Sequence, residues 1–101
     1  MSYLVTCTFD LKDGSRLDYT NAYADLKAIG LEKTIVGSGG SDIVAPTTMT
    51  MGKFDGDSAQ AVRTAVADRV EKAFKRRNFS SEIFVVACGD WAWGARTTKP
   101  Q

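Results

Sequence analysis

Tyr-Leu-Val-Thr-Cys-Thr-Phe, at residues 3–9, is the stretch that decides the fold of this sequence of 101 residues. Its residues belong alternately to two chemical sets, and such an alternation predicts a β-strand with one face toward a core. The set expected to face the core is Tyr3, Val5, Cys7 and Phe9. The set expected to face away from it is Leu4, Thr6 and Thr8, followed by Asp10 at the end of the strand.

One helix is predicted after this strand and a second in the latter half of the chain. Asp18 is expected to cap the first helix and Gly30 to end it. The apolar positions of the first helix are Tyr19, Ala22, Tyr23, Leu26 and Ile29. In the second helix, Asp57 and Gln60 resemble a capping box, and the helical spacing continues until Asn78. The apolar positions of the second helix are Val62, Val66, Val70, Ala73 and Phe74.

Three further stretches predict strands. Residues 33–36 and 43–54 are expected to pair as a hairpin across the glycine-rich residues 37–41. Pro46 has no N–H to donate, so we expect the start of the later strand to be irregular or to lie at an edge. The apolar run at residues 83–88 predicts the last strand, with both faces buried.

This order of elements, βαββαβ, predicts an α+β protein of the ferredoxin-like class. Its four-stranded antiparallel sheet would have the first and third strands at the centre and both helices on one face. Residues 1–95 are expected to form a single domain, because 101 residues leave no room for a second core. Residues 96–101 are expected to form a flexible tail.

The composition excludes several kinds of chemistry. The chain has no histidine, which removes Ser-His-Asp and Cys-His catalytic systems and histidine-ligated zinc. Its two cysteines lie far apart without a CxxC pair, so reduced buried thiols are expected. No apolar stretch approaches the roughly 20 residues of a membrane helix, and no leader with a basic head is recognisable. A cytoplasmic location without membrane contact is therefore expected.

The face of the predicted sheet that the helices leave open needs a cover. The last strand has no polar face, so either the set beginning at Ile83 or the set beginning at Phe84 must point away from the helices. A bare apolar face favours a homodimer, and the alternative is that the C-terminal tail with its two tryptophans folds back over it. The expected dimer interface consists of Leu4, Thr6, Thr8, Val86, Trp91 and Trp93.

Several segments of the chain resemble a known family. Three of them are Phe-Asp-Leu at residues 9–11, Tyr-Ala-Asp-Leu-Lys-Ala-Ile-Gly-Leu-Glu-Lys at residues 23–33, and Pro-Thr-Thr-Met-Thr at residues 46–50. They are similar to the small CRISPR-associated adaptation protein "Cas-two" and to its VapD-like and GhoS-like relatives. Ser-Ala-Gln-Ala-Val-Arg at residues 58–63 and Gly-Asp-Trp-Ala-Trp-Gly at residues 89–94 resemble in particular the SinR-like members.

The resemblance implies a homodimer with Asp10 near the dimer axis, and either metal-dependent nuclease activity or nuclease-like binding of RNA or DNA. It also implies that residues 91–96 add an edge strand to the other protomer. Asp10 would be the catalytic residue and would hold Mg²⁺ or Mn²⁺, since hard cations prefer oxygen ligands. The alternative role of Asp10 is to start the turn that runs to Gly14 by bonding nearby backbone amides.

The cationic residues of the second half predict where a nucleic acid would bind. Residues 57–101 carry eight Lys or Arg against five Asp or Glu, whereas residues 1–56 carry five against seven. The candidate phosphate-binding residues of the second helix are Arg69, Lys72, Lys75, Arg76 and Arg77. The alternative is that the helix dipole favours cations at this end, and that the stems of Arg69 and Arg76 border the apolar stripe.

Two functions of different classes remain open. The first is a nucleic-acid-binding homodimer of the Cas-two/VapD type, with metal-dependent hydrolysis of phosphodiesters, as an endoribonuclease of a CRISPR or toxin–antitoxin system. The second is a noncatalytic dimeric adaptor or antitoxin-like module that binds a protein partner. The net charge of only +1 predicts that any binding of nucleic acid is weak and sensitive to salt.

Overall fold

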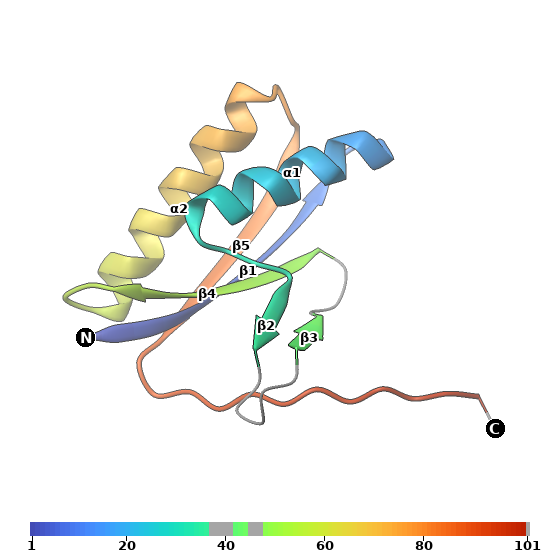
Figure 1. Cartoon of the computed structure of the whole chain (residues 1–101). Coiled ribbons are helices and arrows are strands. Elements are labelled where there is room, and N and C mark those ends of the chain that lie inside the picture. Colours follow the sequence, from blue (N-terminus) through green and yellow to red (C-terminus); the bar gives the residue numbers. More distant parts are fainter. Residues whose placement is uncertain (37–41, 45–47, 101) are drawn as a thin grey trace.

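The computed structural model of the chain describes residues 1–36, 42–44 and 48–100, which form helices and strands in the order βαβββαβ (Figure 1). The elements are β1 (Ser2–Leu11), α1 (Arg16–Ile29), β2 (Thr34–Val36), β3 (Asp42–Val44), β4 (Met49–Asp55), α2 (Ala59–Arg76) and β5 (Ser81–Cys88).

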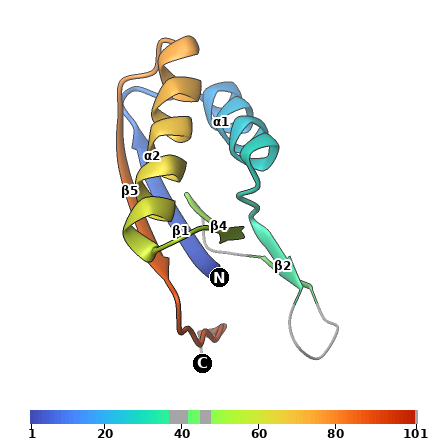
Figure 2. The ribbon, with the colours of Figure 1, turned by 90° about the vertical axis from the view of Figure 1, so that its left-hand side faces the viewer.

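The main sheet has the strand order β4-β1-β5, and both outer strands run antiparallel to β1. Figure 2 shows that α1 and α2 lie on the same side of this sheet. The protein is therefore a small α+β structure with one helical layer on one antiparallel sheet. This architecture is compatible with the predicted ferredoxin-like fold.

The fourth strand of the predicted sheet is not present among the described residues. β2 pairs with β3 in a separate two-stranded sheet, so the predicted hairpin pairing is confirmed, but outside the main sheet. A single bridge joins this region to β4, with reciprocal N–H···O bonds of 2.9 Å between Glu32 and Met51. The chain bends at Lys33 directly after the bridge, and the pairing stops there.

The predicted long strand at residues 43–54 is two strands. β3 ends at Val44 and β4 begins at Met49. Thr48 has a φ of 67°, in the left-handed region that a β-branched residue rarely adopts, and this conformation cannot continue a strand. The hydroxyl of Tyr23 accepts a 2.8 Å bond from the N–H of Thr48 and helps to hold it there. Pro46, where we predict an irregular strand start, lies outside the described residues.

Both helices begin at a serine rather than at the predicted aspartate. Ser15 caps α1 and accepts from the N–H of Asp18, whose carboxylate accepts from the N–H of Ser15, so Asp18 closes a capping box. Ser58, not Asp57, caps α2. Gly30 ends α1 as predicted, with a φ of 113° that favours glycine. α2 ends at Arg76, shortly before the predicted Asn78.

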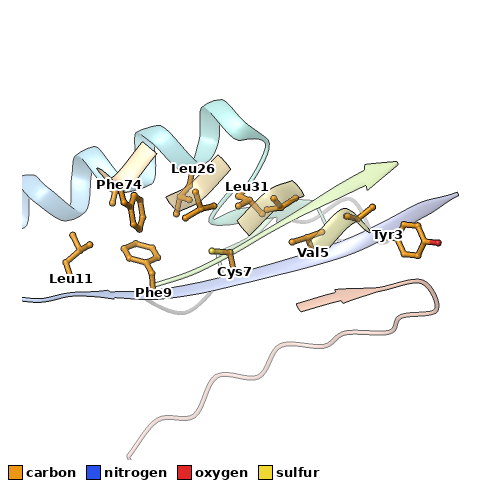
Figure 3. Packing of buried hydrophobic residues seen from close by; sticks show 12 residues of the cluster. Tyr3, Val5, Cys7, Phe9, Leu11, Leu26, Leu31 and Phe74 are labelled. Atoms are coloured by element: carbon orange, nitrogen blue, oxygen red, sulfur yellow. The ribbon is translucent and has the colours of Figure 1, made fainter. Parts of the chain in front are cut away.

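The core lies between the sheet and the helices, as the apolar spacing predicts. In Figure 3 the side chains of Val5, Cys7 and Phe9 rise from β1 toward the helical layer. The buried residues of α1 and α2 that meet them are Ala22, Leu26, Val62, Val66, Val70 and Phe74. The ring of Phe9 lies 5.3 Å from that of Phe74, edge to face. This core fixes which side of each strand remains open.

Residues 89–100, after β5, form no strand within the single chain. The predicted extra strand at residues 91–96 is thus not formed without a partner. Figure 1 shows this segment leaving the domain toward the C-terminus. Among the described residues, no helix combines the length and the apolar character needed to cross a membrane.

Candidate nucleic-acid interface

A cationic groove lies between α1 and α2 on the helical side of the molecule. It has a volume of about 500 Å³. Its lining residues are Asp25, Ala28, Ile29, Arg69, Lys72, Ala73, Arg76 and Arg77. Because residues three, four and seven apart share one side of a helix, α2 presents Arg69, Lys72 and Arg76 to the groove together. Together with Arg77, four of the five predicted phosphate-binding residues therefore line this groove.

Arg77 forms one end of this groove by joining the two helices. Its Nε and Nη2 donate to the two carboxylate oxygens of Asp25 at 3.0 and 2.9 Å, a bidentate pair. The hydrogen bond to Asp25, together with its negative charge, raises the pKa of the Arg77 guanidinium above its usual range. Arg77 therefore holds α1 against α2, rather than presenting its charge freely as predicted for a phosphate contact.

The other three cations of the groove have no such partner. Among the described residues, neither Arg69, Lys72 nor Arg76 forms an ion pair, and the only acidic side chain of the groove is bound by Arg77. Ala28, Ile29 and Ala73 form a small apolar floor. The groove therefore presents three uncompensated positive charges to solvent, which suits a polyanion.

Lys75 lies on a different side of α2 from this groove. Its Nζ is 3.0 Å from Oε1 of Glu71, one turn earlier, and both side chains are largely exposed. Lys75 lines a second groove, between α2 and β5. The structure thus separates Lys75 from the other predicted phosphate-binding residues.

Asp10 lies at the end of β1 on the face that the helices leave open, where the sequence pattern places it. It is exposed, and in the antiparallel register its partner on β5 is Glu82. Both residues line a shallow depression of about 390 Å³ that also includes Thr48 and Phe84. Sequence reasoning missed Glu82, although it directly precedes the apolar run of the last strand. Paired carboxylates of this kind are oxygen ligands that Mg²⁺ or Mn²⁺ accepts.

One chain alone supplies few ligands for a metal ion at this point. Among the described residues, no group of three or more His, Cys, Asp or Glu is close enough to hold one. Asp10 and Glu82 would therefore need water, substrate or a second copy to complete a coordination shell. The alternative role of Asp10 in the following turn finds no hydrogen bond among the described residues. Asp13, with a φ of 55°, forms that turn instead.

The cationic groove and the carboxylate pair lie on opposite sides of the sheet. Side chains alternate along β1, so Asp10 points away from the core that Phe9 enters, whereas α1 and α2 cover that core. The cationic groove and Asp10 therefore open toward opposite sides of the single chain.

The predicted dimer residues occupy the open face, but they differ in exposure. Leu4 is only 8% exposed, and Thr6 and Thr8 are half-buried. Leu4 pairs with Lys53, whose Nζ lies 5.9 Å from the ring centroid of Trp91. The start of the C-terminal segment therefore covers the end of the open face that contains Leu4. This agrees in part with the predicted alternative in which the tail with its two tryptophans folds back over this face.

The opposite end of the open face stays uncovered. β5 points Phe84, Val86 and Cys88 outward, and Phe84 and Val86 are 66% and 38% exposed. Among the residues that the structure describes, β5 is thus covered on only one of its two faces. Trp93, at 37%, is also exposed. Phe84 is the most exposed apolar side chain of the sheet, and the sequence pattern left open whether it or Ile83 faces outward.

Comparisons with known proteins add no relative: no protein-family model, no curated protein and no solved structure matches this chain.

Proposed function

We propose that this chain is a nucleic-acid-binding protein that works as a homodimer and that takes the phosphate backbone into the groove between α1 and α2. The observation that carries the proposal is the set of three uncompensated cations, Arg69, Lys72 and Arg76, along one side of α2. From Arg69 to Arg76 the helix rises by about 10 Å, a distance that spans neighbouring phosphates of a strand.

The homodimer is proposed through the uncovered end of the open face. Phe84 and Val86 lie there beside Thr8 and Thr6 in the strand register. Covering these side chains with a second copy removes apolar surface from water, which favours association. Two copies would carry two cationic grooves and so double the number of phosphate contacts. We also propose that the chain adopts the four-stranded ferredoxin-like sheet of the family that its sequence resembles.

Hydrolysis of the bound strand is the second part of the proposal and depends on Asp10 with Glu82. The family resemblance implies Mg²⁺ or Mn²⁺ at Asp10, and two copies would bring four carboxylates to the open side. A metal ion held there would lower the pKa of a bound water for attack on a phosphodiester. Because this pair lies across the sheet from the groove, separate variants test binding and hydrolysis.

Binding is tested with labelled RNA and DNA oligonucleotides, single-stranded and duplex, over a series of salt concentrations. Three phosphate contacts in one groove predict that log K falls with log[salt] with a slope of about −2 for single strands and about −3 for duplex DNA, and these slopes double when both grooves of a homodimer contact one nucleic acid. The double variant Arg69→Gln/Arg76→Gln should lower the magnitude of this slope by about 1.4 for single strands and about 1.8 for duplex DNA per groove, leaving the contribution of Lys72. Lys75→Gln is the matched control for Arg76→Gln, since Lys75 is the next residue but lies outside the groove. Equal loss in Lys75→Gln and Arg76→Gln would contradict the groove.

Hydrolysis is tested by incubating the same oligonucleotides with Mg²⁺ or Mn²⁺. Asp10→Asn and Glu82→Gln keep the size of each side chain and remove its charge. We expect both variants to retain binding and to lose cleavage. Cleavage by Asp10→Asn at the wild-type rate would overturn the catalytic part, and intact substrates with the wild-type protein would do the same, while leaving the binding part standing.

A noncatalytic adaptor that binds a protein partner is the second candidate function. Its support is the exposure of Phe84 and Val86 on the open face of the sheet. In that case the variant Phe84→Ser should abolish capture of a co-expressed partner while leaving the salt-dependent binding of oligonucleotides unchanged.

A further inference from the structure

The free edge of β5 is a second unpartnered surface, distinct from the open face. Among the described residues, β5 pairs with β1 on one side and with no strand on the other. Its sequence from Ile83 to Cys88 contains no charged residue and no proline. Edge strands are usually protected by such residues, because their unpaired N–H and C=O groups accept another strand. The six residues from Ile83 to Cys88, which follow the charged Glu82 at the start of β5, lack this protection and are suited to pairing.

The helices also leave this edge of the sheet incompletely covered. A groove of about 480 Å³ runs between α2 and β5. Ile83 and Val85 point into the layer between sheet and helices, yet they are only half-buried, whereas Cys7, opposite Val85 on β1, is fully buried. Figure 2 shows β5 at one margin of the sheet with α2 beside it. A second strand at this edge would need its own covering helix to fill the groove.

The side of α2 that borders this groove carries charges that can pair with the same side of α2 in a second copy. Arg63, Ala67, Glu71 and Lys75 follow at intervals of four residues, so they form one stripe along the helix, and all four line the groove. Within the chain, the exposed Lys75 lies 3.0 Å from Glu71, so Glu71 would share its charge between Lys75 and a residue of a second copy. A small side chain stands at the centre, with a positive charge one turn before it and a negative charge one turn after it. A two-fold axis through Ala67 places Arg63 of each copy opposite Glu71 of the other.

The same two-fold axis can also relate two antiparallel β5 strands. Val85 lines the groove together with Ala67, and α2 and β5 run in opposite directions past each other (Figures 1 and 2). Antiparallel pairing of two β5 strands about Val85 brings Phe84 of each copy opposite Val86 of the other. Aromatic and β-branched residues form favourable cross-strand pairs.

We infer that the edge of β5 is a contact surface for a second copy of this chain, in which the two β5 strands pair antiparallel and the two α2 helices lie side by side with Arg63 of each facing Glu71 of the other. The two main sheets then form one continuous six-stranded sheet. This contact uses the edge of β5 rather than its outward face, and it does not depend on the proposed binding of nucleic acid.

Charge reversal tests this pairing by sedimentation of the full chain. In Arg63→Glu two acidic residues face each other at each end of the contact, and in Glu71→Arg two basic residues do. We expect each single variant to sediment at a lower mass than the wild-type protein. An equimolar mixture of the two variants restores opposite charges at both ends, and we expect it to regain the wild-type mass. Arg76→Glu is the matched control, because Arg76 lies on the far side of α2 and should leave the mass unchanged.

Circular dichroism at the same protein concentration shows whether each variant is folded, and both reversals occupy exposed helical positions. Three results would overturn the inference: single variants that sediment like the wild-type protein, a mixture that stays at the lower mass, or a wild-type chain that sediments at 11.0 kDa throughout the micromolar range. Loss of association on truncation after Gly89, with both charge reversals silent, would assign the edge to the C-terminal segment of another copy instead. If Arg63→Glu loses association but still binds oligonucleotides, the pairing of the β5 edges and the proposed binding of nucleic acid are tested separately.

Discussion

The two faces of the β4-β1-β5 sheet differ in how completely the chain's own residues cover them. On the helical face, Val5 and Cys7 of the central strand are fully buried and meet α1 and α2. On the other face, Phe84 is 66% exposed although it is a neighbour of Thr8 across the strand register. The stability of the fold therefore depends mainly on the packing of the covered face. The other face and the edge of β5 remain accessible for contacts with partners.

The two phenylalanines give the largest expected difference between these faces. Phe74→Ala removes a side chain that is 1% exposed and in contact with Phe9 and Phe79, so we expect a loss of about 3–5 kcal/mol in the free energy of unfolding. Phe84→Ala, the matched change on the open face, should cost about 0.5 kcal/mol or less in the folded monomer. Urea unfolding at low protein concentration measures both values.

The same two variants can also contradict this difference between the two faces. If Phe84→Ala costs as much as Phe74→Ala in dilute protein, then the open face is covered already within one chain. A cost for Phe84→Ala that rises with protein concentration would instead measure its contribution to the proposed association.

The two cysteines also differ in burial, and this difference makes stability depend on pH. Cys7 points into the core and Cys88 points outward, so the pair cannot form a disulfide within the chain. Burial raises the pKa of the Cys7 thiol to about 11, while a hydrogen bond with Thr50 lowers it to a smaller extent. The folded chain therefore keeps a proton between pH 9 and 11 that the unfolded chain releases.

Stability should accordingly fall as the pH rises through this window, because unfolding releases a proton there. The expected loss attributable to Cys7 is about 2–3 kcal/mol by pH 11. Cys88→Ala should keep this slope and Cys7→Ala should lose it, and the difference between them cancels the titration of lysines and tyrosines. Identical pH profiles of the two variants would show that the Cys7 thiol is not protected by burial.

Two threonines give the smallest expected effect. Thr50 is buried on the covered face, and its hydroxyl donates a 3.2 Å bond to the carbonyl of Cys7. Thr50→Val should cost about 1 kcal/mol, since that carbonyl loses a partner. Thr8→Val on the open face should lie within about 0.5 kcal/mol of wild type, because valine suits a strand and no core group depends on Thr8. Thermal unfolding under the same conditions compares the two, and a larger loss for Thr8→Val would reverse the assignment of the faces.

The helices and their buried sides could be predicted because they depend on local spacing. Val62, Val66 and Val70 repeat at helical intervals, and a helix brings such residues to one side wherever it lies. The caps were predicted less well, since Asp18 and Ser15 both favour helix starts and only the backbone geometry selects Ser15.

The strand that leaves the main sheet could not be predicted from composition. Residues 34–36 are apolar and β-branched, as a sheet strand would be, and they do form a strand. Whether that strand joins β4 or only β3 depends on the bend at Lys33 and on the conformation of Thr48, which no local pattern encodes.

The candidate site likewise has some features that a single element determines and others that depend on how elements pack. The exposure of Asp10 follows from the alternation along β1, which a single strand determines. The proximity of Glu82 depends on the register between β1 and β5, and the engagement of Arg77 depends on where Asp25 lies on the other helix. Both partners are more than 50 residues distant in sequence, so only the folded chain brings them together.

The sequence by itself determined the two helices, the inward and outward sets of β1, the absence of histidine chemistry and the cationic stripe of α2. Local spacing and residue type are sufficient for these, because each depends on the geometry of one element. The tertiary structure alone decided which cations share the α1–α2 groove, which acid neutralises Arg77, and which face of β5 looks outward. These depend on how separate elements pack, because the favourable free energy of burying apolar surface is determined by the packing of the whole core rather than by any one segment.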